Sequence, residues 1–290
     1  MIDRTIYTIF KKGSTTYFTS TLFFPPGFRE DVFILYSFVR TADDLVDSVP
    51  QQEEGFFSFV DTYRRAAGGE QTGEVVIDSF VDLSRRAGFD PAWVDAFLAS
   101  MEMDLSIRSY RTLDDLSRYL YGSAEVIGLF MAKILSLPPE AMHSARLLGR
   151  AMQYINFIRD ISEDIGLGRV YFPEEDMAHF DLEGLSWDQV RLHPGRFARF
   201  IDHQLDRYEQ WQRGGEEGFR YIPRRMLIPV RTASEMYSWT AGVIRSDPFI
   251  IYREQVKPSR ARIMATAVKN SCSRYPWRRA YPGTVSGLEL

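Results

Sequence analysis

The stretch YSFVRTADDLVD, residues 36–47, joins an apolar segment to three aspartates. In a helix of about 100° per residue, one stripe carries a tyrosine, an arginine and two aspartates: Tyr36, Arg40, Asp43 and Asp47. Val32 and Val39 share this stripe, so the helix is apolar all round before it reaches the acids. Such a helix is normally enclosed by protein, and an enclosed carboxylate needs a counter-charge. Taken alone, aspartates at this spacing are also common on exposed helix faces.

A second acidic segment, QYINFIRDISEDIGLGRVYFP at residues 153–173, repeats the D-x-x-x-D spacing. Its polar stripe consists of amides and carboxylates: Gln153, Asn156, Asp160 and Asp164. Two helices with only oxygen ligands suit Mg²⁺, which completes its shell with water and phosphate oxygens. Arg40 and Arg159 add charge-assisted contacts to the same phosphates. Because the chain has no G-x-x-x-x-G-K-S/T loop, a diphosphate ester is a better substrate than a nucleotide.

Composition excludes several other classes of protein. The 290 residues carry a formal net charge of -4, which argues against general nucleic-acid binding. The single Cys272 and four scattered histidines offer neither an internal disulfide nor a zinc site. The N-terminus does not resemble a signal peptide, and the apolar runs are too short to cross a bilayer. We therefore expect a soluble, cytoplasmic protein.

Helix start and stop signals divide the rest of the chain. DPAW at residues 90–93 places an N-cap acid before a proline, and Gly88 ahead of it suits a helix end. TLDD from Thr112 and SWDQ from Ser186 have the capping-box spacing. Strand-like alternation is scarce. These signals predict one all-α domain over residues 1–290, with a polar, unstructured tail after Gly283.

Both acidic segments resemble the signature segments of the squalene/phytoene synthase family, the head-to-head prenyl transferases. GSTTYFTSTLFFPPGFRED, residues 13–31, is similar to the family's N-terminal substrate segment. MDLSIRSYRTLDDLSRYLYGSAEVIGLF, residues 103–130, and ASEMYSWTAGVIR, residues 233–245, resemble its central and C-terminal helices. The resemblance covers about residues 8–270 and implies a single helical bundle of the isoprenoid-synthase type with a central cavity.

The resemblance also implies roles for individual residues. The metal ligands would be Asp43, Asp47, Asn156, Asp160 and Asp164. Contacts to diphosphates or reacting allyl groups would come from Ser14, Thr16, Tyr17, Tyr36, Arg40, Gln153, Arg159, Tyr237 and Arg253. The match at Arg253 needs a one-residue shift in spacing. Many members carry His at the place of Gly13 and Phe at the place of Tyr17, so the first diphosphate contact is built differently here.

The implied reaction joins two prenyl diphosphates through a cyclopropyl diphosphate intermediate. Phytoene from two geranylgeranyl diphosphates is the favoured product. Squalene or dehydrosqualene from farnesyl diphosphate is the alternative, and only squalene would require NADPH. Mg²⁺ is the expected metal, with Mn²⁺ as a substitute. We expect Tyr17, Phe18, Tyr36 and Phe38 to line the cavity.

Other interpretations remain open at this stage. A class I terpene cyclase uses similar metal chemistry, although its second metal motif usually differs from Asp160 and Asp164. A non-catalytic assembly protein could keep the same fold. The basic C-terminal residues, with Glu289 as the only acid among them, indicate either a solvated face or peripheral contact with anionic lipid. These residues are Lys257, Arg260, Arg262, Lys269, Arg274, Arg278 and Arg279.

Overall fold

The computed structural model describes residues 2–272, and within them the ordered elements are helices and one isolated β-bridge between Tyr110 and Pro173. The predicted all-α class is therefore confirmed. The predicted tail after Gly283 lies outside the described residues. None of the helices between residues 2 and 272 is long and apolar enough to span a membrane.

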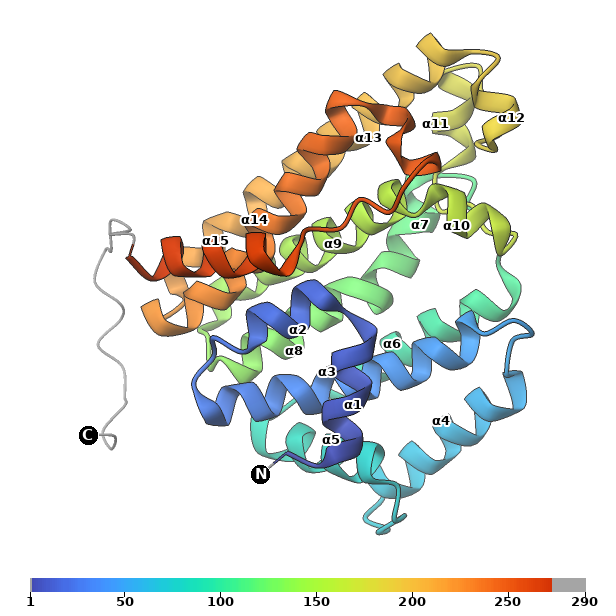
Figure 1. Ribbon diagram of the computed structural model, residues 1–290. Helices are drawn as coiled ribbons and strands as arrows, with labels where there is room; N and C mark the ends of the chain where they lie inside the picture. Colours follow the sequence, from blue (N-terminus) through green and yellow to red (C-terminus); the bar gives the residue numbers. More distant parts are fainter. Residues whose placement is uncertain (1, 273–290) are drawn as a thin grey trace.

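The first part of the chain supplies the helices that Figure 1 draws in blue and cyan. They are α1 (Arg4–Gly13), α2 (Thr15–Thr21), α3 (Pro26–Asp47), α4 (Glu53–Ala67), α5 (Val75–Ala87) and α6 (Pro91–Ser106). The middle of the chain forms α7 (Leu113–Leu120), the π-helix η1 (Tyr121–Glu125), α8 (Val126–Ile134), η2 (Pro139–Ala141), α9 (Met142–Arg159) and α10 (Ile161–Gly166).

The last part runs back along α9. It comprises α11 (Glu174–His179), α12 (Trp187–Val190), α13 (Pro194–Glu216), η3 (Glu217–Tyr221), α14 (Arg224–Ser246), η4 (Pro248–Tyr252) and α15 (Arg260–Cys272). Packing of α13 on α9, α9 on α8 and α8 on α3 stacks the helices in layers (Figure 1). Helix α9 therefore lies in the middle of the molecule, with the second acidic segment at its end.

The predicted helix boundaries rest on the expected capping contacts. Asp90 Oδ1 accepts from the backbone N–H of Ala92 at 2.9 Å, and Pro91 opens α6. Thr112 and Ser186 each form a capping box, as their spacing predicts. Gly88 ends α5 with φ 66°, in the left-handed region that favours glycine.

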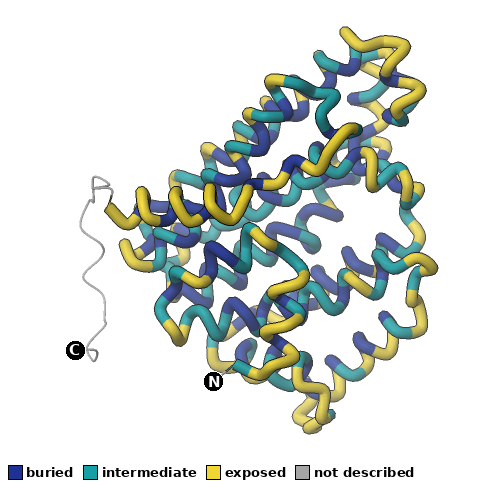
Figure 2. The backbone as a smooth tube through the Cα atoms, viewed as in Figure 1, coloured by how far each residue is buried: buried dark blue, intermediate teal, exposed yellow. Residues whose placement is uncertain are grey.

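Two hydrophobic clusters form the core, and the space between them positions the site. One cluster is built mainly from α1 to α6 and α8, and the other from α7, α9, α13 and α14. Gly122 lets η1 lie directly on α6, because a Cβ there would come within 2.0 Å of the Ala96 carbonyl oxygen. Figure 2 shows the exposed positions along the outer faces of α4 and α15.

Candidate active site

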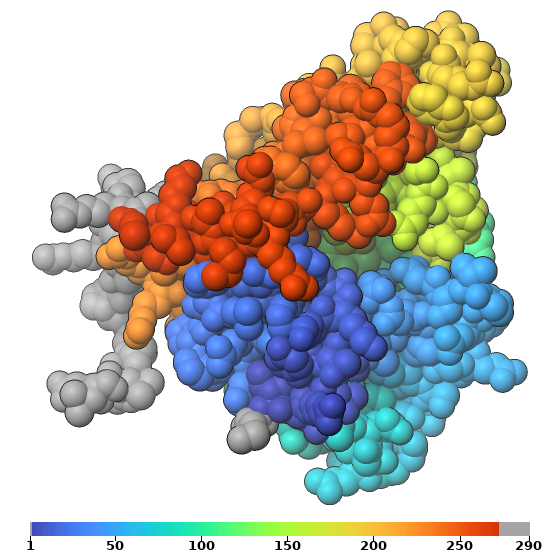
Figure 3. All heavy atoms as spheres, viewed as in Figure 1, coloured from blue at the N-terminus to red at the C-terminus, as the bar shows by residue number. Residues whose placement is uncertain are grey.

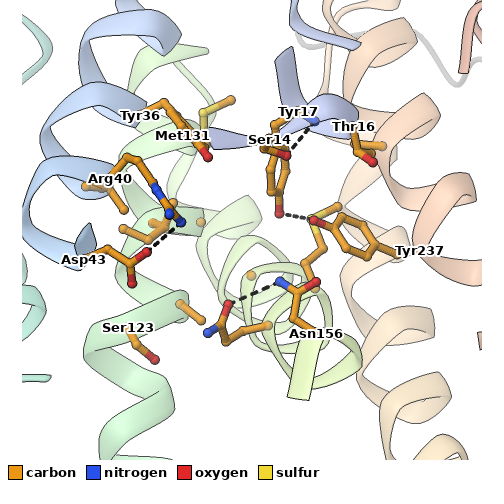
Figure 4. A pocket seen from close by; sticks show the side chains of 18 of the residues that line it. Ser14, Thr16, Tyr17, Tyr36, Arg40, Asp43, Ser123, Met131, Asn156 and Tyr237 are labelled. Atoms are coloured by element: carbon orange, nitrogen blue, oxygen red, sulfur yellow. Dashed lines mark hydrogen bonds and ion pairs between the residues drawn. The ribbon is translucent and has the colours of Figure 1, made fainter. Parts of the chain in front are cut away.

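A cavity of about 870 Å³ is bordered by residues of both core clusters. This volume lies toward the upper end of the roughly 300–1,000 Å³ typical of small-molecule sites. Its walls come from α2, α3, α8, α9 and α14, and Figure 4 shows side chains from these helices converging on it. Apolar and polar residues both line it, so it suits a ligand with an apolar body and a charged head.

The stripe predicted on α3 faces this cavity along its whole length. Val32 and Val39 line the cavity, and Tyr36, Arg40 and Asp43 follow on the same wall (Figure 4). Asp44 and Asp47 complete the wall at the end of the helix. The same helix face thus changes from apolar to acidic, which explains why an enclosed helix ends in so much negative charge.

The second acidic segment forms another wall of the same cavity. Gln153, Asn156, Asp160 and Asp164 all line it. The segment is not one continuous helix, because Asp160 has φ -99° and ψ 13° and separates α9 from α10. The Asp164 N–H still donates to the Asp160 carbonyl at 2.8 Å, so both carboxylates stay on the same wall. The structure therefore brings the two D-x-x-x-D segments to one cavity.

Each cavity arginine is engaged by an aspartate. Arg40 pairs with Asp43 at 3.0 Å and with Asp44 at 2.5 Å. The Nε of Arg159 donates to Asp160 at 2.7 Å, and Arg169 forms an ion pair with Asp47. Such pairs hold the carboxylates in place without neutralising all of them.

Two aspartates of the cavity have raised pKa values. Burial, followed by the charge of Asp47, raises the pKa of Asp43, and Arg40 only partly offsets this. Burial and the charges of Asp160 and Asp47 raise the pKa of Asp164 to about 8. Carboxyl groups shifted in this direction bind a cation as they lose their protons.

The donor set fits Mg²⁺. The Oδ1 of Asn156 is buried and has no hydrogen-bond partner, which leaves an acceptor directed at no protein donor. Within residues 2–272, no three acidic, histidine or cysteine side chains form a ready-made metal cage. Mg²⁺ rarely uses such a cage and is usually held by one or two carboxylates together with substrate phosphates. These walls therefore suit a metal that arrives with a diphosphate.

The N-terminal candidates and Tyr237 meet at another side of the cavity (Figure 4). Ser14 caps α2 by accepting from the Tyr17 N–H at 3.2 Å, and Thr16 lines the cavity beside it. The rings of Tyr17 and Tyr237 lie 5.7 Å apart. A Cβ on Gly13 would come within 2.6 Å of the Tyr36 hydroxyl, so glycine at this place makes room for that tyrosine.

Three candidates lie elsewhere. Arg253 does not line the cavity and pairs with Asp247 at the surface. The prediction that Phe38 lines the cavity is wrong, since it is buried and stacks on Phe80 with centroids 3.7 Å apart. Phe18 also packs on the first core cluster instead, its ring meeting Phe10 and Phe33.

Several cavity residues were not identified from the sequence. The buried Asp104 accepts from the hydroxyls of Tyr119 at 2.7 Å and Tyr171 at 2.9 Å. Arg169 holds Asp47, and Lys12 and Lys257 also line the cavity. Asp104 had the same signal as Asp43, a carboxylate at the end of an apolar helix, but it lacked a second acid one turn away.

Known proteins resemble this chain over most of its length. The model of the family described as squalene/phytoene synthase matches residues 10–262. A 15-cis-phytoene synthase of Synechococcus elongatus is 27% identical over 260 residues, which cover 83% of this chain and 82% of that protein. Another, from Enterobacter agglomerans, is 31% identical over 238 residues, covering 78% of this chain and 80% of that protein.

Solved structures show the same fold at lower sequence identity. A dehydrosqualene synthase in complex with a ligand superposes with a TM-score of 0.78 at 20% identity, covering 91% of this chain and 93% of that one. A squalene synthase from Alicyclobacillus acidocaldarius gives a TM-score of 0.74 at 21% identity, covering 84% and 93%. The helical bundle is therefore shared with a squalene synthase and a dehydrosqualene synthase.

Proposed function

Since the chain belongs to the squalene/phytoene synthase family, we propose that it condenses two geranylgeranyl diphosphates head to head into phytoene through a cyclopropyl diphosphate. The observation that carries this proposal is the pair of acidic walls, one on α3 and one on α9 and α10, facing one large cavity. The curated relatives described above are phytoene synthases, which favours the twenty-carbon substrate. Squalene or dehydrosqualene from farnesyl diphosphate is the alternative product, and only squalene would draw on NADPH.

The polar end of the cavity would bind the diphosphates. Its metal ligands would be Asp43, Asp47, Asn156, Asp160 and Asp164. Bound Mg²⁺, or Mn²⁺ in its place, supplies positive charge to a departing diphosphate. Arg40 and Arg159 lie beside these ligands and would donate to phosphate oxygens. Lys12 and Lys257 border the same cavity, and neither forms an ion pair among residues 2–272.

The apolar end would hold the two prenyl chains and keep water away from the cations. Its lining includes Val32, Leu35, Ile127, Met131 and Phe219. An aromatic wall closer to the acids includes Tyr119, Phe157 and Tyr171, and the rings of Phe157 and Tyr171 stack at 4.2 Å. Aromatic faces attract cations, so this wall suits positively charged intermediates. Exclusion of water prevents their capture as alcohols.

A product assay tests the proposal. Purified protein is incubated with fifteen- or twenty-carbon prenyl diphosphate, with and without Mg²⁺ and NADPH, and the extracted hydrocarbon is identified. We expect phytoene from the twenty-carbon substrate, formed only with the metal and independently of NADPH. Squalene or dehydrosqualene would establish the alternative product. Neither hydrocarbon nor released diphosphate under any condition would identify a non-catalytic assembly protein.

We also propose that α15 contacts anionic lipid, where such substrates and products reside. Met264 and Val268 are 44% and 56% exposed on its outer face, and Arg260 and Lys269 are exposed on the same helix. Figure 3 shows α15 at the molecular surface beside α2. Of the other predicted basic residues, Lys257 borders the cavity and Arg262 lies over the ring of Trp239, 4.6 Å from its centroid. Arg274, Arg278 and Arg279 lie outside the described residues.

Each basic residue near the lipid surface would contribute about 1 kcal/mol at low salt. Co-sedimentation with phosphatidylglycerol vesicles, but not with phosphatidylcholine vesicles, is the expected result. Equal binding to both kinds of vesicle would remove the proposal.

A further inference from the structure

The proposed function leaves one buried carboxylate in the cavity wall without a role. Asp104 belongs to α6, is 2% exposed and borders the cavity. The hydroxyl of Tyr119 donates to its Oδ2 at 2.7 Å, and the hydroxyl of Tyr171 donates to its Oδ1 at 2.9 Å. No ion pair joins Asp104 to an arginine or lysine within residues 2–272. Its two strong partners are therefore phenols, which also line the cavity.

The surroundings of Asp104 connect it to the acidic wall on α3. Arg169 donates to the Tyr171 hydroxyl at 3.3 Å and forms an ion pair with Asp47. Gln51 Nε2 donates to the carbonyls of Val46 at 2.7 Å and of Asp104 at 2.9 Å. This amide ties the end of α3 to the end of α6. The two tyrosines are therefore held in a fixed relation to the proposed metal and diphosphate end of the cavity.

The chemistry of the carboxylate sets the direction of both hydrogen bonds. An ionised Asp is only an acceptor, so both phenols must donate to it. The Tyr119 oxygen then keeps its lone pairs for other partners. The Tyr171 oxygen also accepts from Arg169 at 3.3 Å and keeps only its remaining lone pair for the cavity. The rings of Tyr119 and Tyr171 stack at 5.3 Å, which gives the pair a single orientation. A preorganised negative dipole of this kind stabilises a cation without reorganising during the reaction.

We propose that Asp104 is a positioning residue. It accepts the hydroxyl hydrogen bonds of Tyr119 and Tyr171, and this leaves both phenol oxygens available to stabilise the carbocations formed in the cavity. This inference rests on the proposed function. Asp104 itself does not touch the substrate. Its effect reaches the reacting atoms through the two tyrosines.

The variant Asp104→Asn tests the electrostatic part of this proposal. An amide has the shape of the carboxylate but offers one acceptor oxygen and an N–H donor, so at least one phenol must redirect its proton. We expect kcat to fall about 100-fold or more while KM for the prenyl diphosphate stays within about threefold. The ratio of prenyl alcohol to hydrocarbon among the products should also rise, because carbocations that are not stabilised are captured by water.

Asp176→Asn is the matched control for this variant. Asp176 is also a buried carboxylate, accepting from Gln204 at 3.2 Å and pairing with Arg207, but it does not line the cavity. We expect this variant to change the melting temperature without changing the ratio of alcohol to hydrocarbon. If Asp104→Asn keeps wild-type kcat and product ratio, or if Asp176→Asn shifts that ratio equally, the proposal is wrong.

A second measurement does not depend on activity. Burial raises the pKa of Asp104 to about 6, and the Tyr119 hydroxyl, Arg169 and the Tyr171 hydroxyl oppose this, while the charge of Asp47 adds to it. The ring of Tyr110 also lies nearby, 5.6 Å from that of Tyr119. Carboxyl ¹³C NMR of labelled protein should therefore show a higher Asp104 pKa in Tyr119→Phe and in Tyr171→Phe.

An unmoved Asp104 pKa in both phenylalanine variants would show that the phenols do not donate to it and would overturn the proposal. Wild-type protein that releases no diphosphate would overturn the proposed function instead. The NMR measurement still decides whether Asp104 holds the two phenols in that case. The two failures are therefore distinguishable.

Discussion

Carboxylates paired with arginines or lining the cavity occur in two kinds of surroundings in this molecule. Glu125, on η1, is 1% exposed and is met by Nε of Arg146 at 2.7 Å and Nε of Arg150 at 2.8 Å. Arg146 stacks on Tyr121 and Arg150 stacks on Trp211, so the charged groups of this cluster have their partners within the protein. In the cavity, Arg40 is shared between two aspartates, and Asp164 has no ion-pair partner within residues 2–272.

The difference separates an acid that the protein itself satisfies from acids that we propose bind a metal. A carboxylate with two arginines is satisfied by the protein itself, and its loss is a matter of stability. Aspartates that outnumber their arginines are satisfied only when another cation arrives. The pKa values of Asp43 and Asp164 are raised because the nearby arginines only partly offset burial and the charges of neighbouring carboxylates. Substitutions in the two regions should therefore affect activity and stability differently.

Neutralising an acidic wall should have the largest effect. Asp43→Asn or Asp160→Asn removes a ligand charge while keeping the shape, so we expect turnover to fall about 10³-fold or more. Helix content measured by circular dichroism should stay at the wild-type level. Glu125→Gln is the control and should keep its activity within about tenfold. Wild-type turnover in either aspartate variant would contradict the site.

Removing the arginines of the Glu125 cluster should affect stability instead. The double variant Arg146→Ala/Arg150→Ala leaves Glu125 buried without its partners, and we expect the free energy of unfolding to fall by about 3–5 kcal/mol. Urea denaturation measures this change. Arg40→Ala should cost far less, because the side chains of Asp43 and Asp44 remain 32% and 56% accessible. Equal losses of unfolding free energy in the double variant and in Arg40→Ala would contradict the proposed difference between the two regions.

Asp164→Asn should stabilise the metal-free protein. The pKa of Asp164 is raised to about 8 in the folded state, so between about pH 4 and pH 8 the folded chain holds a proton that the unfolded chain has lost. Stability contributed by this group therefore falls as the pH rises through that window. We expect the variant to gain about 1–3 kcal/mol over wild type at pH 9 and nothing at pH 4.

Thermal unfolding across this pH range measures the gain. Mg²⁺ with inorganic diphosphate should then stabilise wild type more than the variant. A variant that is less stable than wild type at pH 9 would mean that Asp164 is already satisfied by the protein.

The sequence was sufficient for the fold class and for both acidic walls. Capping residues such as Asp90 and Thr112 act on their own neighbours, so their effect can be predicted locally. A helical wheel also predicts which face of α3 carries Asp43. On the same wheel Phe38 falls opposite that face, which agrees with its burial in the core and not with the expected place in the cavity lining.

Other parts of the site depend on partners far apart in the chain. Arg169 meets Asp47 across 122 positions, and Tyr171 meets Asp104 across 67. No local pattern predicts such contacts, because they depend on how α6 and the loop after α10 pack together. The break between α9 and α10 at Asp160 was likewise not predicted, because no proline or glycine marks it in the sequence.

The two basic residues before α15 offer the smallest and most selective test. Arg253 is already paired with Asp247. Lys257 borders the cavity, and within residues 2–272 its Nζ donates only to Gln255 Oε1, at 2.9 Å. A cation without a carboxylate partner can bind a diphosphate without first giving up an ion pair. We therefore expect Lys257→Ala to raise KM about tenfold, the value of one charge-assisted hydrogen bond, and Arg253→Ala to change it less than about twofold. Initial rates at saturating Mg²⁺ measure both, and a larger effect at Arg253 would restore the assignment that the family resemblance implied.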